Sequence, residues 1–254
     1  MKQFKFILLF CLGSSALFAQ ENKKSPYIKR TSTEGSTTLA SEGKITSLSL
    51  GILQYWGLGH NKRNAKIGLG ARLTSSIGNK NLLYQTAPAI LTSGKTGPGV
   101  FFSPQIPANI DTLSVKSTQV NALNLYLALR YDFAKKWGVE FNIDMIGISF
   151  GGNKDVTLTY GEKSNATRNT SAKPTLLNAL LVSDNDLGSL NSEFMISYQY
   201  NKKLKLKAGA VFLFNEYTIE KPVLYTNSLG TVVSTDRYRA KSLQAGIGLN
   251  YHLK

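Results

Sequence analysis

Residues 124–150 contain two runs of alternating apolar and polar residues, joined by the three-residue basic turn Ala134–Lys136. Side chains on a β-strand point alternately to opposite faces, so each run has one apolar and one polar face. The apolar faces comprise Leu125, Leu127, Leu129, Tyr131 and Phe133 in the first run, then Val139, Phe141, Ile143 and Met145 in the second. Both runs are long enough to cross a bilayer as tilted strands. This pattern is typical of a transmembrane β-barrel, with lipid outside and a polar lumen inside.

The same alternation predicts seven strands along the chain. They span about residues 45–56, 64–76, 120–133, 137–150, 191–201, 203–217 and 239–253. The connections alternate between short ones (Gly57–Arg63, Ala134–Lys136, Asn201–Lys203) and long polar ones (about 77–119, 151–190, 218–238). Short periplasmic turns and long extracellular loops are expected of an outer-membrane barrel. An exported chain that starts and ends in the periplasm needs an even number of strands. We therefore predict a further, weaker strand within residues 25–40 and about eight strands in total.

The N-terminus has the features of a secretory signal peptide. Lys2 and Lys5 precede a short apolar stretch, and small residues lead to Ala19. The apolar stretch is too short for a spanning helix, so membrane insertion requires a barrel. We accordingly divide the chain into a signal (1–19), an N-terminal segment with the weak first strand (20–44) and the barrel (45–254). Cys11 lies in the signal, and lipidation there is the less favoured alternative because bulky Phe10 precedes it.

The chain is strongly basic, with a formal net charge of +15. In an exported protein the anionic partner we expect is lipopolysaccharide phosphate rather than nucleic acid. An equally weighted interpretation is that scattered lysines keep the loops solvated.

The turns fix a strand register that can be tested. Pairing across Ala134–Lys136 sets Arg130 opposite Glu140 and Tyr126 opposite Asp144, all inside the barrel. The second hairpin likewise sets lysines opposite Gln199 and Ser197. The predicted lumen charge network comprises Lys66, Arg72, Arg130, Glu140, Asp144, Lys205 and Lys207. An Arg or Lys facing lipid at the midplane would cost about 2–4 kcal/mol, which favours the inward placement. An ion-pair network filling the lumen is favoured over an anion-attracting pore, because an eight-stranded lumen holds little more than side chains.

Aromatic residues cluster beside the short turns. The pattern Tyr-x-aromatic-x-Lys-Lys occurs at residues 131–136 and again at 198–203. Aromatic rings at the headgroup level with lysines beyond them in water form the girdle of a membrane protein. The predicted girdle comprises Trp56, Tyr131, Phe133, Trp137, Tyr198 and Tyr200. Two ordinary hairpins with cross-strand aromatic pairs are the simpler alternative.

Motifs for catalysis or cofactor binding are weak. Ser93-Gly94-Lys95-Thr96 lacks the first glycine of a phosphate-binding loop, because position 89 is alanine. Glu140 and Asp144 are four residues apart on one strand face, roughly 13 Å, which is far for paired acid–base catalysis. His60 and His252 have no evident catalytic or metal-binding partners. We therefore expect no catalytic residues, no metal and no cofactor.

Three features carry a resemblance to a known family: the signal ending Phe-Ala-Gln, the turn Arg-Tyr-Asp-Phe-x-Lys-Lys-Trp and the closing Gly-Ile-Gly-Leu-Asn-Tyr-His-Leu-Lys. They resemble small outer-membrane β-barrel proteins of the Bacteroidota type, loosely similar to the OmpA/OmpX superfamily. The resemblance implies an all-β, antiparallel, up-and-down barrel delivered by the outer-membrane assembly machinery. It supplies no functional residues. The favoured function is a non-enzymatic barrel with a filled lumen and a structural or loop-mediated binding role. The alternatives are a narrow anion-preferring channel and a lipid-modifying hydrolase, and the rival fold is a soluble β-sandwich.

Overall fold

The computed structural model describes residues 28–58, 64–78, 81–87, 89–95, 103–161, 166–181, 186–226 and 230–253. The predicted signal peptide (1–19) and His60 lie outside these residues. The described chain forms one antiparallel sheet of 13 strands. The strands are β1 (Ile28–Ser41), β2 (Ile45–Leu58), β3 (Ala65–Gly78), β4 (Leu82–Thr86), β5 (Thr112–Val115), β6 (Thr118–Tyr131), β7 (Trp137–Phe150), β8 (Lys154–Thr159), β9 (Thr167–Pro174), β10 (Leu177–Ala179), β11 (Leu190–Gln199), β12 (Leu204–Thr226) and β13 (Val232–His252). A short helix α2 (Ala89–Ser93) and a 3-10 turn η2 (Pro107–Asn109) lie between β4 and β5. Within the described residues, no helix combines the length and the apolar character needed to cross a membrane.

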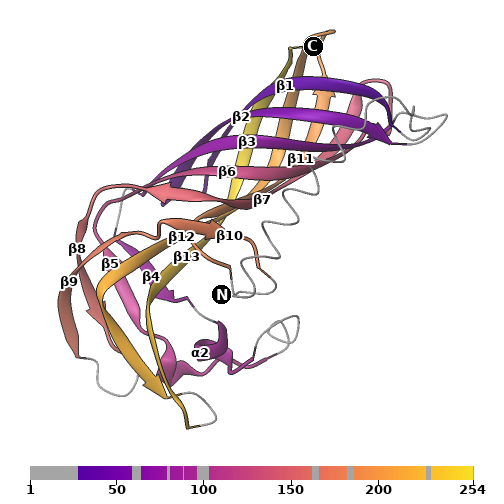
Figure 1. Cartoon of the computed structure of the whole chain (residues 1–254). Helices are drawn as coiled ribbons and strands as arrows, with labels where there is room; N and C mark the ends of the chain where they lie inside the picture. The colour runs from indigo at the N-terminus through magenta and orange to yellow at the C-terminus, as the bar shows by residue number, and fades with distance from the viewer. Residues whose placement is uncertain are drawn as a thin grey trace.

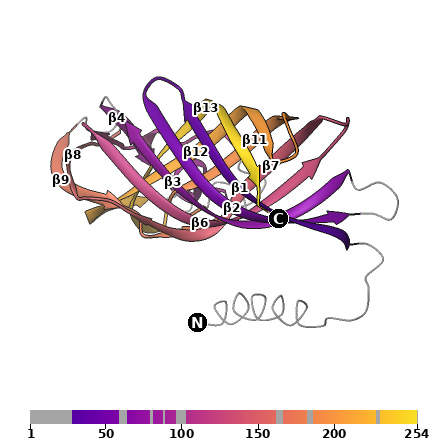
Figure 2. The ribbon, with the colours of Figure 1, turned by 90° about the horizontal axis from the view of Figure 1, so that it is seen from above.

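Eight of the strands pair in a closed cycle, which we call the main ring. Its order is β1, β2, β3, β6, β7, β11, β12 and β13, and β13 pairs back with β1. Figure 1 shows these strands tilted together around a common axis, and Figure 2 shows the same arrangement from above. The expected total of about eight strands is wrong, because five further strands lie outside the main ring in the described chain. They arise from residues that period-two counting assigned to the long connections.

A second closed cycle, which we call the cap ring, accounts for four of these extra strands. The C-terminal part of β12 and the N-terminal part of β13 pair with each other, and β9, β8, β5 and β4 complete the cycle between them. β12 and β13 are therefore shared by the two rings, and Figure 1 shows them running from one into the other. The fifth extra strand, β10, pairs with the C-terminal end of β7.

The predicted register of the β6–β7 hairpin is confirmed: Arg130 pairs with Glu140 and Tyr126 with Asp144. In the β11–β12 hairpin, Ser197 pairs with Lys207, also as predicted. Beyond Asp144 a bulge inserts one residue into β7, so that Leu125 pairs with Ile146. The apolar face consequently continues through residues 146, 148 and 150, where strict alternation would have turned them inward.

The connections differ between the two ends of the main ring. At one end, which we call the turn end, β6–β7 and β11–β12 are joined by short turns and β1 begins beside the end of β13. At the other end, two long segments form β4–β5 and β8–β10, and β12 and β13 continue as a long hairpin. The fourth connection there, Glu42–Lys44 between β1 and β2, is short, contrary to the expectation of long loops throughout. β1 itself lies in the interval where the parity argument required a strand.

The two rings have opposite polarity. The main ring buries polar and charged side chains and exposes apolar ones, for example Leu50, Leu125 and Phe194. The cap ring does the reverse: its interior is an apolar cluster that includes Tyr84, Leu113 and Leu158. Along each strand, the apolar side chains mostly face outward where the strand belongs to the main ring and inward where it belongs to the cap ring. The same chain thus contains an apolar exterior and an apolar interior, separated along the axis.

Candidate functional site

The turn end of the main-ring lumen contains an ion-pair cluster that we call the turn-side network. Arg130 donates from both terminal nitrogens to the Glu34 carboxylate, with both distances 2.6 Å. Its Nε lies 2.9 Å from Glu140 Oε1. Lys205 Nζ lies 3.8 Å from Glu140 Oε1 and 3.8 Å from Asp132 Oδ1. Because Arg130 and Glu140 are almost fully buried, these charges depend on one another for stability.

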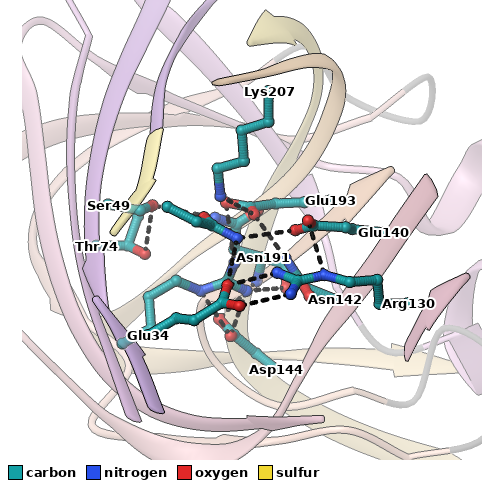
Figure 3. Close-up of polar contacts among 12 residues, drawn as sticks. Glu34, Ser49, Thr74, Arg130, Glu140, Asn142, Asp144, Asn191, Glu193 and Lys207 are labelled. Atoms are coloured by element: carbon teal, nitrogen blue, oxygen red, sulfur yellow. Dashed lines mark hydrogen bonds and ion pairs between the residues drawn. The ribbon is translucent and has the colours of Figure 1, made fainter. Parts of the chain in front are cut away.

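A second cluster, the central network, lies deeper in the lumen. Arg72 Nη2 lies 2.5 Å from Asp144 Oδ1, and its Nη1 lies 3.0 Å from Glu193 Oε1. Lys207 Nζ lies 3.5 Å from Glu193 Oε2, and Asn142 donates to that same oxygen at 3.0 Å. Figure 3 shows charged side chains of both networks converging within the ring, among them Arg130, Glu140 and Glu193.

The buried charges of the two networks are balanced. Four cations face four carboxylates: Arg72, Arg130, Lys205 and Lys207 against Glu34, Glu140, Asp144 and Glu193. Every one of these eight groups is within ion-pair distance of an opposite charge. Together these eight groups carry no net charge, so the two networks do not by themselves attract an anion.

Two tyrosine rings pack between inward-facing glycines and the guanidinium groups of Arg130 and Arg72. The Arg130 guanidinium carbon lies 4.0 Å from the centroid of the Tyr55 ring. A Cβ added at Gly68 would lie 2.7 Å from that ring, so only glycine leaves room for it. Tyr126 packs in the same way against Arg72, and a Cβ added at Gly70 would lie 2.7 Å from the Tyr126 ring. The inward glycines are thus explained by crowding in the lumen.

A third polar cluster closes the opposite end of the lumen. Glu216 on β12 is fully buried and accepts from Arg237 Nε at 2.7 Å and from Arg239 Nη2 at 2.8 Å. Both arginines also donate to the Asp186 backbone carbonyl. The Gly188 amide donates to Glu216 at 3.1 Å and ties the segment before β11 to the same carboxylate.

An apolar layer lies between the lumen and the cap ring, where the core of the cap ring begins. Leu213 and Tyr217 on β12 belong to that core and are buried. Between this layer and the central network lies a void of about 10 Å³, lined by Asp144, Asn191 and Leu213 among others. Such a void is at the lower limit for a single water molecule. The lumen is therefore blocked by two charge networks and an apolar layer in series.

The turn end opens into a cavity of about 1010 Å³, which we call the vestibule. Its inner wall is the turn-side network, and the β6–β7 and β11–β12 turns form its rim. Lys66 Nζ lies 3.2 Å from Asp132 Oδ2 at this level. Lys66 therefore belongs to the vestibule wall, whereas the other six predicted lumen residues belong to the two networks.

The six predicted girdle residues surround this same end. Tyr131, Phe133, Trp137 and Tyr200 are exposed, whereas Trp56 and Tyr198 are half-buried. Trp137 and Tyr198 pair across β7 and β11, and their ring centroids are 4.9 Å apart. Lys136 Nζ lies 5.7 Å from the Tyr198 centroid.

Two buried acids that complete the networks were absent from the predicted set. Glu193 precedes outward Phe194 in β11, so period-two alternation already placed it inward and could have identified it. Glu34 lies in a Ser- and Thr-rich strand without a clear apolar face, so its direction had no local signal. Its contact with Arg130 depends on the pairing of β1 with β13, which closes the main ring.

Other chemistry finds little support among the described residues. No group of three or more His, Cys, Asp or Glu side chains there is placed to hold a metal ion. His252 lines the vestibule, and its backbone amide donates to the Lys203 carbonyl at 2.7 Å.

The cap side of the molecule has two polar hollows. One, of about 500 Å³, lies where the β1–β2 turn, β4 and β13 meet, and Lys44, Gln85 and Lys241 line it. The other, of about 770 Å³, is lined by Lys116 and Lys154 beside β5 and β8.

Comparisons with known proteins give only remote likenesses. No protein-family profile and no curated protein matches this sequence. Among solved structures, the chain is similar to Neisserial surface protein A (9% identity, 89% of this chain and 97% of that chain, TM-score 0.31). It is also similar to the attachment invasion locus protein Ail of Yersinia pestis (6%, 88% and 97%, TM-score 0.29) and to a major outer membrane protein of Thermus thermophilus (11%, 89% and 100%, TM-score 0.33). At these TM-scores the likenesses carry no weight in the functional assignment.

Proposed function

We propose that this protein is a non-enzymatic outer-membrane β-barrel with a filled lumen, and that its cap ring performs a structural or binding role outside the cell. The observation that carries this proposal is the opposite polarity of the two rings. An exposed apolar surface is stable only in lipid, and an apolar interior with a polar exterior is stable in water. A boundary between the two environments therefore falls where the main ring meets the cap ring.

The dimensions of the main ring fit this role. Strands β2, β3, β6 and β7 have 14 residues each, against the roughly 9–11 that a tilted strand needs to cross the hydrocarbon core. Closure of the ring leaves no unpaired strand edge in lipid. The exposed aromatic residues at the turn end then lie at the headgroup level of the periplasmic leaflet.

The proposal includes delivery by the signal peptide at residues 1–19 and folding by the outer-membrane assembly machinery. The cap faces outward because the short turns of such a barrel face the periplasm and its long connections face the exterior. Lys241 lies two residues from Leu243, whose side chain is 66% exposed on the apolar surface. This places Lys241 and the hollow that it shares with Lys44 at the outer headgroup level, where lipopolysaccharide phosphates would meet them.

The filled lumen favours a non-conducting barrel over the anion-preferring channel. The balanced networks and the apolar layer would all have to move before an ion could pass. Among the residues that the structure describes, no observation favours a lipid-modifying hydrolase.

Two measurements on the refolded mature chain test the proposal. Gel mobility that changes on boiling, together with extraction only by detergent, is expected of an inserted barrel; extraction without detergent would contradict insertion. In planar bilayers the inserted protein should show no discrete conductance steps. Anion-selective steps that shrink in Lys205→Glu would replace the filled-lumen proposal with the channel.

A further inference from the structure

The vestibule is strongly basic, although the lumen behind it is balanced. Seven cationic and two acidic side chains line it. The two acids are already engaged: Glu34 by Arg130, and Asp132 by Lys66 and Lys205. The protein therefore supplies no further carboxylate within the described lining for the cations that remain.

The remaining cations are the four lysines of the two turns: Lys135, Lys136, Lys202 and Lys203. All four are exposed. β7 and β11 hold the two turns side by side, because the backbone amide of Gln199 donates to the backbone carbonyl of Lys136 at 2.7 Å. Among the residues with assigned structure, these four lysines form no ion pair with a carboxylate.

Their placement makes the combined charge more effective than four scattered lysines would be. They surround a concave opening whose walls are protein, and concave surfaces with low-dielectric walls concentrate the field of their charges. The cavity of about 1010 Å³ is at the upper end of the roughly 300–1,000 Å³ typical of small-molecule sites. Lysine ammonium groups act as point charges toward phosphate and require no fixed planar geometry.

We propose that the vestibule is a binding site for multivalent phosphate anions, held by the lysines of the two turns above the fixed turn-side network. The site itself follows from the geometry of the turn end, and only its location in the periplasm rests on the proposed function. Two sources share this chemistry: a soluble polyphosphorylated molecule that enters the cavity, and the phosphates of anionic phospholipids beside the rim.

Titration of the refolded full chain in nonionic detergent with inorganic tripolyphosphate tests the site. Binding is followed by calorimetry and by fluorescence of Trp137, which adjoins Lys136 through Tyr198. The test variant replaces Lys135, Lys136, Lys202 and Lys203 by Gln. The control variant carries the same change in charge at exposed lysines remote from the vestibule: Lys95, Lys116, Lys173 and Lys221 to Gln.

The test variant should bind roughly tenfold more weakly or worse, because four exposed ion pairs are lost together. The control variant should bind as the wild type does, and added salt should weaken wild-type binding. Equal affinity in the test variant and the wild type, or an equal loss in the control variant, would overturn the proposal.

Repeating the titration in nanodiscs separates the two sources. If the wild type binds tripolyphosphate equally well in phosphatidylcholine and phosphatidylglycerol nanodiscs, the result supports a soluble anion as the occupant of the vestibule. Affinity that is kept in phosphatidylcholine nanodiscs and lost in phosphatidylglycerol nanodiscs supports lipid phosphates as occupants. A barrel that shows heat-modifiable mobility yet binds no tripolyphosphate in any setting overturns this inference and leaves the proposed function intact.

Discussion

Removing Arg130 alone should destabilise the barrel more than removing the whole charge group around it. In Arg130→Met, the buried carboxylates of Glu34 and Glu140 lose their main partner, at contacts of 2.6 Å and 2.9 Å. Breaking a buried ion pair in this way costs about 3–5 kcal/mol. In the triple variant Arg130→Met/Glu34→Gln/Glu140→Gln, no carboxylate is left uncompensated, and Lys205 keeps Asp132. We expect the triple variant to remain within about 2 kcal/mol of the wild type.

The assay is urea unfolding in detergent micelles, followed by the fluorescence of Trp56 and Trp137. With a slope of roughly 2 kcal/mol per molar urea, the single variant should unfold about 2 M earlier than the wild type. The triple variant should recover most of that shift. A loss below about 1 kcal/mol in Arg130→Met, or an equal loss in both variants, would refute the view that mutual compensation stabilises the lumen.

Three further predictions concern the lipid face, the crowded lumen and the cap. Leu125→Arg should lower the free energy of unfolding by about 2–4 kcal/mol in a bilayer. Leu224→Arg on the cap, where the leucine is 71% exposed, should leave it unchanged; equal effects in bilayer unfolding assays would contradict the assigned membrane boundary. Gly70→Val should cost at least about 1–3 kcal/mol by overpacking, whereas Gly35→Ala, with open space around it, should cost far less in the same urea assay. Burial raises the pKa of Tyr225 well above 10.0, so the cap gains stability from this group below pH 10 and loses it as the pH rises further. Hydrogen exchange of the cap between about pH 9 and 11 should show this loss, and no acceleration beyond the intrinsic rate would count against it.

Much of the main ring could be predicted from sequence because each strand has an exposed apolar face and a polar face toward the lumen. That contrast produces strict alternation, and the short turn before Trp137 then fixes the register of Arg130 and Glu140. The bulge at Met145 had no such signal, since an inserted apolar residue leaves the local composition unchanged.

The cap ring could not be predicted for a different reason. Its strands are as short as the four residues of β5, and they pair with segments far away in the chain. Local periodicity reports which face of a strand is buried and carries no information on its distant partner. For the same reason the role of Glu34 in the lumen could not be predicted, because its contact with Arg130 spans 96 positions.

The sharing of β12 and β13 by both rings imposes an order on folding. The hydrogen bond from Asn250 to Glu34 spans 216 positions, so the main ring cannot close until nearly the whole chain has been delivered. The cap ring also needs β12 and β13, although β4, β5, β8 and β9 precede them in the chain. These four strands therefore cannot complete the cap ring until the last hairpin is in place. Such high contact order predicts slow, late and concerted closure, in which one C-terminal hairpin completes both rings.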